Sequence, residues 1–296
     1  MVGGSTNRRH SSMVHFFPCS QTPSPLAARS PGAASPGLIN SRYILEPAHP
    51  QYEGQMAELR RSFHEDGVLV MPDFVDPKHV PQLVTEAVSL SPVAYHNHER
   101  SNAFLRPVDQ TKPKDHIEAM EGVARINVIA NDQIPQDSLL RQIYDHPQLT
   151  RFIQDIVGNG PVFKYECPLG ALNYQLMGDG DKIRWHYDIA EFVASIPLQK
   201  AEEGGKFEYV KDLRLLDDAD FSRTKGILNG HADSAIKRLQ ATPGSLILFQ
   251  GRNTLHSVTP IEGHKPRINC LLGYASEPHQ RATPYVQEMR YGRSLQ

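Results

Sequence analysis

The chain has 296 residues, of which 39% are hydrophobic and 22% are charged, and its formal net charge is -2. This length and mixture allow a sizeable core, so the composition excludes a wholly disordered protein. The near-zero net charge provides no field of one sign to hold nucleic acid or an anionic membrane. The apolar runs are too short to span a bilayer, and small or neutral partners are therefore expected.

The N-terminal segment differs in composition from the rest of the chain. Residues 1–42 are rich in Ser, Pro, Gly and Arg, and the first acidic residue is Glu46. Frequent prolines would interrupt the amphipathic helix of a transit peptide, so we predict a disordered tail, with an organellar signal as the alternative. Cys19, Cys167 and Cys270 form no CxxC pair, which favours a reducing compartment, and we expect a cytoplasmic protein.

The first half of the ordered chain, from Tyr43, reads as helices around two short strands. A long loop is also predicted, because residues 95–116 are polar and irregular. Helical spacing of apolar residues and plausible caps predict the helices, and short apolar runs predict the strands. The helices are expected over 51–66, after Asp76, over 138–144 and over 147–157, and the strands over 68–71 and 122–130.

From residue 161 onward, short β-rich runs alternate with Gly-containing turns. Many short strands at close intervals are typical of a barrel or a double-sheet jelly roll. Residues 212–235 interrupt this rhythm and are expected to form a surface excursion. We predict one mostly β domain over 43–296 (α+β), in which helices at about 51–160 flank a β-core at about 161–276.

A metal-binding pattern lies inside the β-rich half. His186 and Asp188 are two residues apart, so their side chains share one face of an extended segment. His256 follows in a second strand-like segment, which a double-sheet roll can bring alongside. Two imidazoles and one carboxylate form the facial triad of non-heme iron(II) oxygenases. We therefore predict that His186, Asp188 and His256 bind iron(II), although an HxD spacing also arises by chance among 14 histidines.

Arg267 strengthens this interpretation because it follows His256 by eleven residues, on the strand expected to run back beside it. Its planar guanidinium matches the far carboxylate of 2-oxoglutarate, while the keto acid chelates the iron. The alternative is an ordinary exposed strand cation.

Four segments carry a resemblance to a known family: WHYDIAEF, LQKAEEGGKFEY, TPGSLILFQGRNTLHSVTPIEGHKPRIN and ECPLGALNYQLM. They resemble the iron(II)/2-oxoglutarate dioxygenases, in the branch of free-amino-acid oxygenases and radical amino-acid halogenases. The resemblance implies a double-stranded β-helix, iron(II) bound by His186, Asp188 and His256, and 2-oxoglutarate bound by Arg267. Dioxygen would be the second cosubstrate, and Asn173 a further contact to 2-oxoglutarate.

One position separates two chemistries within this branch. The halogenases that the sequence resembles have Gly or Ala where this chain has Asp188, and chloride takes the site on iron. With Asp188 present, we expect hydroxylation of an unactivated carbon. Desaturation or ring closure, for example onto an amine, would use the same residues and stays open. A cupin-like metal-binding protein without turnover is the alternative from another class.

The expected substrate is a free amino acid or a similarly small metabolite, and three residues are candidates to bind it. Arg125 lies on an apolar strand and needs a partner, which is either the substrate or an internal acid. Glu191 follows the metal motif closely, and Asn269 shares the face of Arg267 by strand alternation. Structural hydrogen bonds are the alternative for Glu191 and Asn269. No membrane or nucleic-acid partner is expected, and the sequence leaves the oligomeric state open.

Overall fold

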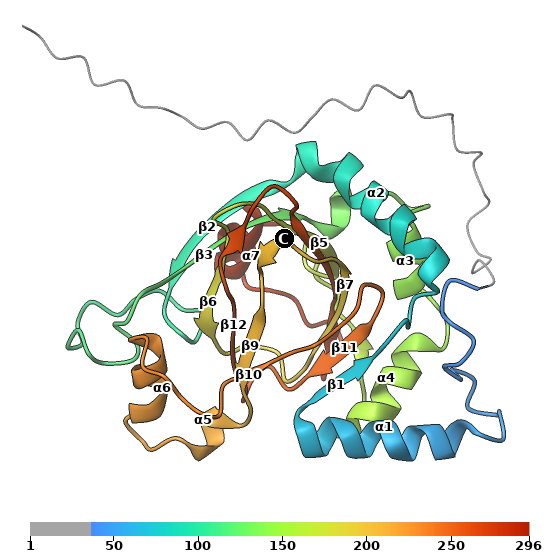
Figure 1. The fold of residues 1–296 in the computed structure, drawn as a ribbon, viewed down its shortest axis with the longest axis horizontal. Helices are drawn as coiled ribbons and strands as arrows, with labels where there is room; N and C mark the ends of the chain where they lie inside the picture. The colour runs from blue at the N-terminus through green and yellow to red at the C-terminus, as the bar shows by residue number, and fades with distance from the viewer. Residues whose placement is uncertain (1–36, 296) are drawn as a thin grey trace, which may run out of the picture. The chain divides into compact units, whose positions relative to one another are not determined.

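The structure is a computed structural model that describes residues 37–295 (Figure 1). The helices are α1 (Tyr52–Asp66), α2 (Val80–Leu90), α3 (Leu139–Tyr144), α4 (Leu149–Val157), α5 (Leu213–Leu216), α6 (Ser222–Leu228) and α7 (Pro284–Tyr291). The strands are β1 (Val68–Met71), β2 (Tyr95–Ser101), β3 (Gly122–Ile129), β4 (Phe163–Lys164), β5 (Leu172–Met177), β6 (Ile183–His186), β7 (Val193–Gln199), β8 (Glu203–Gly204), β9 (Phe207–Val210), β10 (Lys237–Arg238), β11 (Leu246–Phe249), β12 (Leu255–Val258), β13 (Ile261–Glu262), β14 (Arg267–Leu272) and β15 (Tyr274–Ala275).

Two antiparallel sheets form the β-core. The larger has the strand order β1-β11-β7-β14-β5-β3-β2, and the smaller has the order β10-β9-β12-β6. Their inner faces meet, since the ring of Phe207 on β9 packs edge-on against Phe249 on β11 with centroids 5.3 Å apart. Strands of the two sheets surround one interior in Figure 1. The predicted fold, mostly β with flanking helices around a double-stranded β-helix, is confirmed.

Helices support the larger sheet from outside. Met56 and Phe63 form the buried stripe of α1, which packs on α4 and β1. Gly67 ends α1 in the left-handed conformation that glycine adopts without strain, and its N–H donates to the Phe63 carbonyl. Ser138 caps α3 by accepting from the N–H of Arg141. These helices fix the outer face of the sheet, so its inner face is left to line the interior.

The structure differs from the predicted tail boundary. Within the predicted tail 1–42, residues 1–36 lie outside the described residues. Leu38, however, is buried, and Ile39 forms a β-bridge with Val75. Apolar residues therefore join the core before Tyr43. No helix in the described range 37–295 is long and apolar enough to cross a membrane.

The predicted loop over 95–116 is wrong at its start, because its first residues form β2. This strand pairs with β3 at the edge of the larger sheet. Its buried side chains are polar, namely those of Asn97, Glu99 and Ser101, so the sequence shows no apolar alternation. The excursion at 212–235 carries the short helices α5 and α6, and α7 follows the β-core near the C-terminus.

Candidate metal centre

Strand pairing brings the three predicted metal ligands together. β6 and β12 are antiparallel neighbours, and His256 lies directly opposite His186 in their register. The two imidazole centroids are 4.1 Å apart. The carboxylate of Asp188 lies 3.6 Å from His186 Nε2 and 3.3 Å from His256 Nε2. One potential ligand atom from each residue lies within 4.8 Å of the others, so a single ion can contact all three.

The backbone sets the tautomer of both imidazoles. His186 Nδ1 lies 2.9 Å from the carbonyl oxygen of Arg184, and His256 Nδ1 lies 2.9 Å from that of Thr254. A carbonyl can only accept a hydrogen bond, so each Nδ1 carries the proton. Each Nε2 therefore presents a lone pair toward the carboxylate, which is the arrangement of a metal-bound histidine.

The electrostatics of the site also suit a divalent cation. Burial lowers the pKa of His186, and neighbouring His256 lowers it further, so this imidazole is neutral. Burial would raise the pKa of Asp188, but His256 and His186 hold it well below its usual range. Asp188 Oδ2 is buried and has no hydrogen-bond partner among the described residues. An orphaned carboxylate oxygen between two nitrogen donors fits iron(II).

Gly251 gives Asp188 the room to occupy this position. The N–H of Asp188 donates to the carbonyl of Gly251 over 3.0 Å. A Cβ built at Gly251 would overlap Asp188 Oδ2, so any other residue there would push the carboxylate aside. No local sequence pattern marks Gly251 as a site residue, because its contact with Asp188 joins distant parts of the chain.

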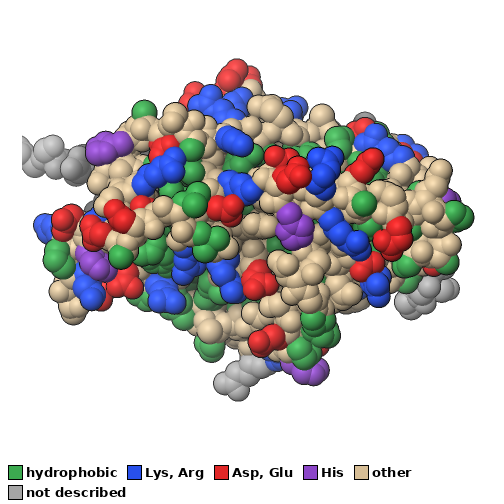
Figure 2. Space-filling model, turned by 90° about the horizontal axis from the view of Figure 1, so that it is seen from below, with side chains coloured by type: hydrophobic (Ala, Val, Ile, Leu, Met, Phe, Trp, Pro, Cys, Tyr) green, Lys and Arg blue, Asp and Glu red, His purple; other side chains and the backbone are tan. Residues whose placement is uncertain are grey.

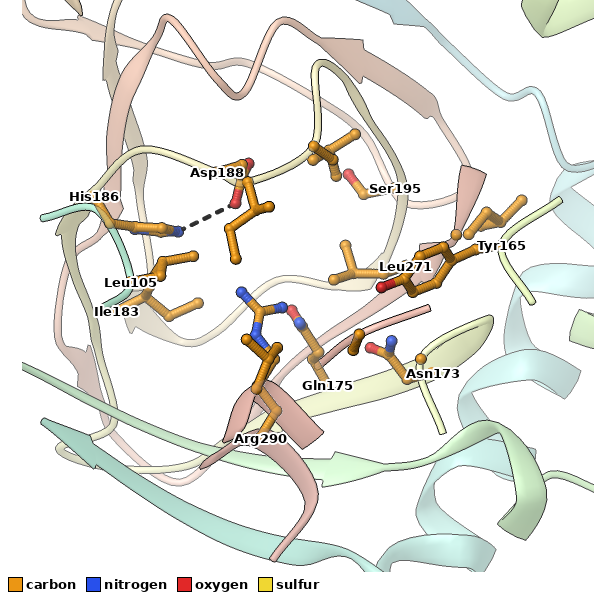
Figure 3. A pocket seen from close by; sticks show the side chains of 18 of the residues that line it. Leu105, Tyr165, Asn173, Gln175, Ile183, His186, Asp188, Ser195, Leu271 and Arg290 are labelled. Atoms are coloured by element: carbon orange, nitrogen blue, oxygen red, sulfur yellow. Dashed lines mark ion pairs between the residues drawn. The ribbon is translucent and has the colours of Figure 1, made fainter. Parts of the chain in front are cut away.

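The triad opens into a cavity of about 470 Å³ between the two sheets (Figure 3). This volume lies within the range of roughly 300–1,000 Å³ that is typical of small-molecule sites. Apolar side chains that include Leu105, Ile183 and Leu271 line much of its wall. The metal centre therefore lies at the wall of a largely apolar pocket.

Arg267 extends from β14 into the same cavity. It has no acidic partner among residues 37–295, and the contact of its Nη1 is the sulfur of Met177 at 3.8 Å. Burial lowers its pKa to about 10, so the guanidinium remains charged at neutral pH. A buried cation without a counter-charge is costly, which makes Arg267 a strong candidate to bind an anion.

Three other predicted residues also line the cavity. Asn269 is buried on the same face of β14 as Arg267. Asn173 is buried on β5, and its Oδ1 has no partner among the described residues. Glu191 lies half exposed beside Arg252, with 3.6 Å between the carboxylate and Nη1. Strand alternation predicted this position for Asn269 and closeness to the metal motif predicted it for Glu191, whereas Asn173 was implied by the family resemblance.

Arg125 is not brought into the cavity. Strand alternation on β3 turns Ala124 and Ile126 inward, so Arg125 points to the other face of the sheet. Its Nη2 donates to the carbonyl of Gly180 over 2.7 Å. The structure therefore does not bring Arg125 to the candidate site, because the apolar face of the strand lines the interior.

Sequence reasoning missed three polar residues of the cavity: Asn97 and Glu99 on β2, and Arg290 on α7. Figure 3 shows the Arg290 side chain extending into the cavity, with its guanidinium beside the amide of Gln175. One signal for α7 was present in the sequence. Thr283 precedes a proline, and its side chain caps the helix.

Comparisons with known proteins agree with this architecture. A family model described as Halogenase D matches residues 51–290. The comparison with curated proteins gave no match.

Several solved structures share the fold at low sequence identity. The 2-oxoglutarate-dependent epimerase SnoN from nogalamycin biosynthesis is 17% identical over 82% of this chain and 94% of its own, with a TM-score of 0.54. The carbocyclase SnoK from the same biosynthesis is 14% identical over 81% and 92%, with a TM-score of 0.52. A prolyl hydroxylase from Trichoplax adhaerens is 12% identical over 78% and 96%, with a TM-score of 0.51. At these identities the likeness shows the fold alone.

Proposed function

The chain belongs to the Halogenase D family, and on that premise we propose that it is an iron(II)- and 2-oxoglutarate-dependent oxygenase. Its reaction is the hydroxylation of an unactivated carbon in a free amino acid or similarly small metabolite. One observation carries the proposal. A His-Asp-His triad with ligand atoms within 4.8 Å shares a cavity with Arg267, a buried guanidinium that lacks an acidic partner in the described chain.

Each side chain has a separate task. His186 and His256 hold the metal through Nε2, while their Nδ1–H groups are fixed by backbone carbonyls. Asp188 supplies an ionised oxygen that offsets part of the metal charge. Arg267 binds the far carboxylate of 2-oxoglutarate, and the amides of Asn173 and Asn269 offer further hydrogen bonds in the same cavity. Iron(II) held by the triad, together with 2-oxoglutarate, would supply the oxidising chemistry toward carbon, while these side chains bind and orient the two groups.

Asp188 supports oxygenation over halogenation, despite the name of the family. In the halogenases that this sequence resembles, Gly or Ala at this position leaves a site for chloride. Here the carboxylate lies within 3.6 Å of both imidazoles and stays ionised, so it takes that site itself. The backbone of Asp188 is also fixed beside the metal site, because its N–H donates to the Gly251 carbonyl.

The experiment is turnover of the iron-loaded enzyme with 2-oxoglutarate and a panel of free amino acids, with succinate as the readout. The reaction is run under ¹⁸O-labelled dioxygen with excess chloride, and the product is identified by mass spectrometry. We expect a product with one labelled oxygen and no chlorine. A chlorinated product would contradict the role of Asp188.

Two other outcomes select the alternatives. An unlabelled product two hydrogens lighter than the substrate would assign desaturation or ring closure to the same site. Metal binding with no succinate formed, with or without amino acid, would favour a metal-binding protein without turnover. Arg267 supports turnover, because such a protein has no need to hold the carboxylate of a keto acid.

A further inference from the structure

The cavity contains a second guanidinium, Arg290, that the proposed function has not used. It extends from α7 into the interior (Figure 3) and forms no hydrogen bond or ion pair with any residue of the described range. Burial lowers its pKa, but Glu99 and other neighbours raise it above the usual value, so the group is a cation. A half-buried cation that lines a cavity without a counter-charge is a candidate to bind an anion.

The seating of α7 fixes where this cation lies. α7 packs on β2 and β3. Thr283 caps its first turn, and Gly292 ends it in the left-handed conformation with φ of 67°. A Cβ at Gly292 would overlap the ring of Tyr95 on β2, so the helix end is pressed directly onto that strand. Arg290 is therefore held on the same side of the cavity as β2.

Arg290 and Arg267 enter the cavity from different elements. Arg290 extends from α7, which packs on β2 and β3, whereas Arg267 extends from β14. With 2-oxoglutarate at Arg267, as in the proposed function, Arg290 is left for a second anion.

β2 adds acceptor oxygens beside Arg290. Asn97 is 2% exposed, and its Oδ1 has no partner among the described residues. Glu99 is also buried, and one of its oxygens accepts from Arg184 and Ser101. The pKa of Glu99 is pushed up by burial but held below its usual value by Arg184 and Arg290, so it is ionised. Glu99 and Arg290 thus influence each other electrostatically but form no ion pair, and both line the cavity.

The charges of the cavity favour an anionic group at Arg290. Iron(II) and the 2-oxoglutarate dianion, together with Asp188 and Arg267, form a set with no net charge. Arg184 neutralises Glu99 through their buried ion pair. Arg290 then remains a cation without a counter-charge, and a substrate carboxylate would supply that counter-charge.

We propose that Arg290 binds the carboxylate of the substrate, and that Asn97 and Glu99 accept hydrogen bonds from its ammonium group. The substrate class is therefore a free α-amino acid whose side chain points toward the metal centre. This inference rests on the proposed function, since it takes Arg267 to be occupied by 2-oxoglutarate.

The test measures binding, so that it does not depend on turnover. Wild-type protein and Arg290→Gln are loaded with nickel(II) and 2-oxoglutarate and titrated by calorimetry. The probes are the free amino acids of a standard panel and the carboxamide of each. In wild type, we expect at least one amino acid to bind and its carboxamide to bind at least about 30-fold more weakly, as for loss of a buried charge pair. Arg290→Gln should bind that amino acid about 30-fold more weakly and no longer discriminate against the carboxamide.

Controls separate this result from misfolding and from failure of the proposed function. Arg293→Gln removes a neighbouring arginine that pairs with Asp132 over 2.7 Å outside the cavity, and it should bind as wild type does. Arg290→Lys keeps the charge and should recover part of the affinity, and the melting temperatures of the unliganded variants report folding. The carboxamide comparison in wild type needs no variant.

Each remaining outcome decides between the two proposals. Equal amino-acid affinity in Arg290→Gln and wild type would overturn the inference. Weaker 2-oxoglutarate binding in Arg290→Gln would assign Arg290 to the cosubstrate and overturn it too. Wild type that binds nickel and 2-oxoglutarate but no amino acid would overturn this subsite and leave the cofactor assignment intact. Failure to bind 2-oxoglutarate at all would instead contradict the proposed function.

Discussion

The two walls of the cavity are built in different ways. The wall formed by β14, β5 and β12 carries His256, Arg267, Asn269 and Asn173 on strands that lie inside their sheets. The second wall, at the edge of the larger sheet, is formed by the edge strand β2 and by α7, and it carries Asn97, Glu99 and Arg290. The first wall has side chains whose type and spacing indicate a metal and a keto acid. The second wall has a buried ion pair and a free guanidinium, and the sequence spacing of these residues indicates no particular ligand.

The two walls differ because they are proposed to bind different ligands. Iron(II) and 2-oxoglutarate would be the same in every enzyme of this chemistry, so the residues that hold them form a pattern. A substrate differs between enzymes, and its wall is assembled from whichever side chains the edge strand and the last helix bring together. The proposed division predicts that changes to one wall leave the ligand of the other nearly unaffected.

The largest effect is expected for His186→Ala or His256→Ala, because each removes a metal ligand. Loss of a group that only orients a ligand costs about 10–100-fold in metal affinity, so loss of the ligand itself should cost more than about 100-fold. Succinate formation should disappear with it. Calorimetric titration with nickel(II) measures the affinity, and His98→Ala on the exposed face of β2 is the control. One-to-one binding of unchanged strength would refute the triad.

On the other wall, Glu99→Gln should lower the free energy of unfolding by about 3–5 kcal/mol, because it leaves Arg184 buried without its partner. Glu121→Gln is the matched control. It breaks the exposed pair of Glu121 with Arg100 on the outward face of β2, at a cost of about 0–1 kcal/mol. Urea unfolding at neutral pH compares the two, and equal losses would argue against the buried pair.

The stability difference between wild type and Glu99→Gln should also depend on pH. The folded pKa of Glu99 is below its usual value, so its ionised form contributes stability above about pH 4.3, the usual pKa of a glutamate. That contribution is lost as the pH falls through the folded pKa. The stability difference between wild type and Glu99→Gln should therefore shrink below about pH 4, whereas a constant difference would contradict the ion-pair account.

A smaller effect on ligand binding is expected for Arg267→Gln. Loss of a buried pair with a carboxylate should weaken 2-oxoglutarate binding by about 2–5 kcal/mol, while nickel affinity stays close to that of wild type. Arg238→Gln, which removes an exposed pair with Glu208, serves as the control. If the dissociation constant for 2-oxoglutarate barely changes, another cation holds the keto acid, and Arg290 becomes the next residue to test.

The smallest effect on ligand binding is expected for Gly251→Ala, which adds one methyl group beside Asp188 Oδ2. The displaced carboxylate should weaken metal binding by about 10–100-fold, the effect of disturbing a ligand's support. Gly54→Ala is the matched control, since a Cβ there meets nothing within 4 Å in α1. It should stabilise the helix by about 1 kcal/mol. Unchanged metal affinity in Gly251→Ala would mean that Asp188 has another position from which to bind.

Much of the metal-binding wall could be predicted from sequence because local rules apply to it. Strand alternation placed His186 and Asp188 on one face, and it placed Arg267 and Asn269 on another. The extent of β1 and the end of α1 at Gly67 followed from apolar runs and a capping glycine. Gly251 could not be found in this way, because its contact with Asp188 joins residues 63 positions apart in the sequence.

The wall formed by β2 and α7 could not be predicted from the sequence, for physical reasons that differ from residue to residue. β2 has polar side chains on both faces, so the alternation that marks a half-buried strand is not visible in it. Arg125 was assigned to the cavity because it is charged, although apolar Ala124 and Ile126 mark the inward face of the same strand. The direction of Arg290 depends on how an eight-residue helix docks on β2, which no local pattern encodes.

The position of β2 at the edge of the sheet has a consequence for motion. Among the described strands, β2 has a neighbour on one side, β3, whereas β14 is paired on both sides. Edge segments open at a lower free-energy cost than central strands, so backbone amides of β2 should exchange with solvent deuterium sooner than those of β14. Such opening would move Asn97 and Glu99 while Arg267 stays in place. The wall proposed to bind the substrate is thus the one that opens locally and can admit it. A bound amino acid should slow the hydrogen exchange of the β2 amides.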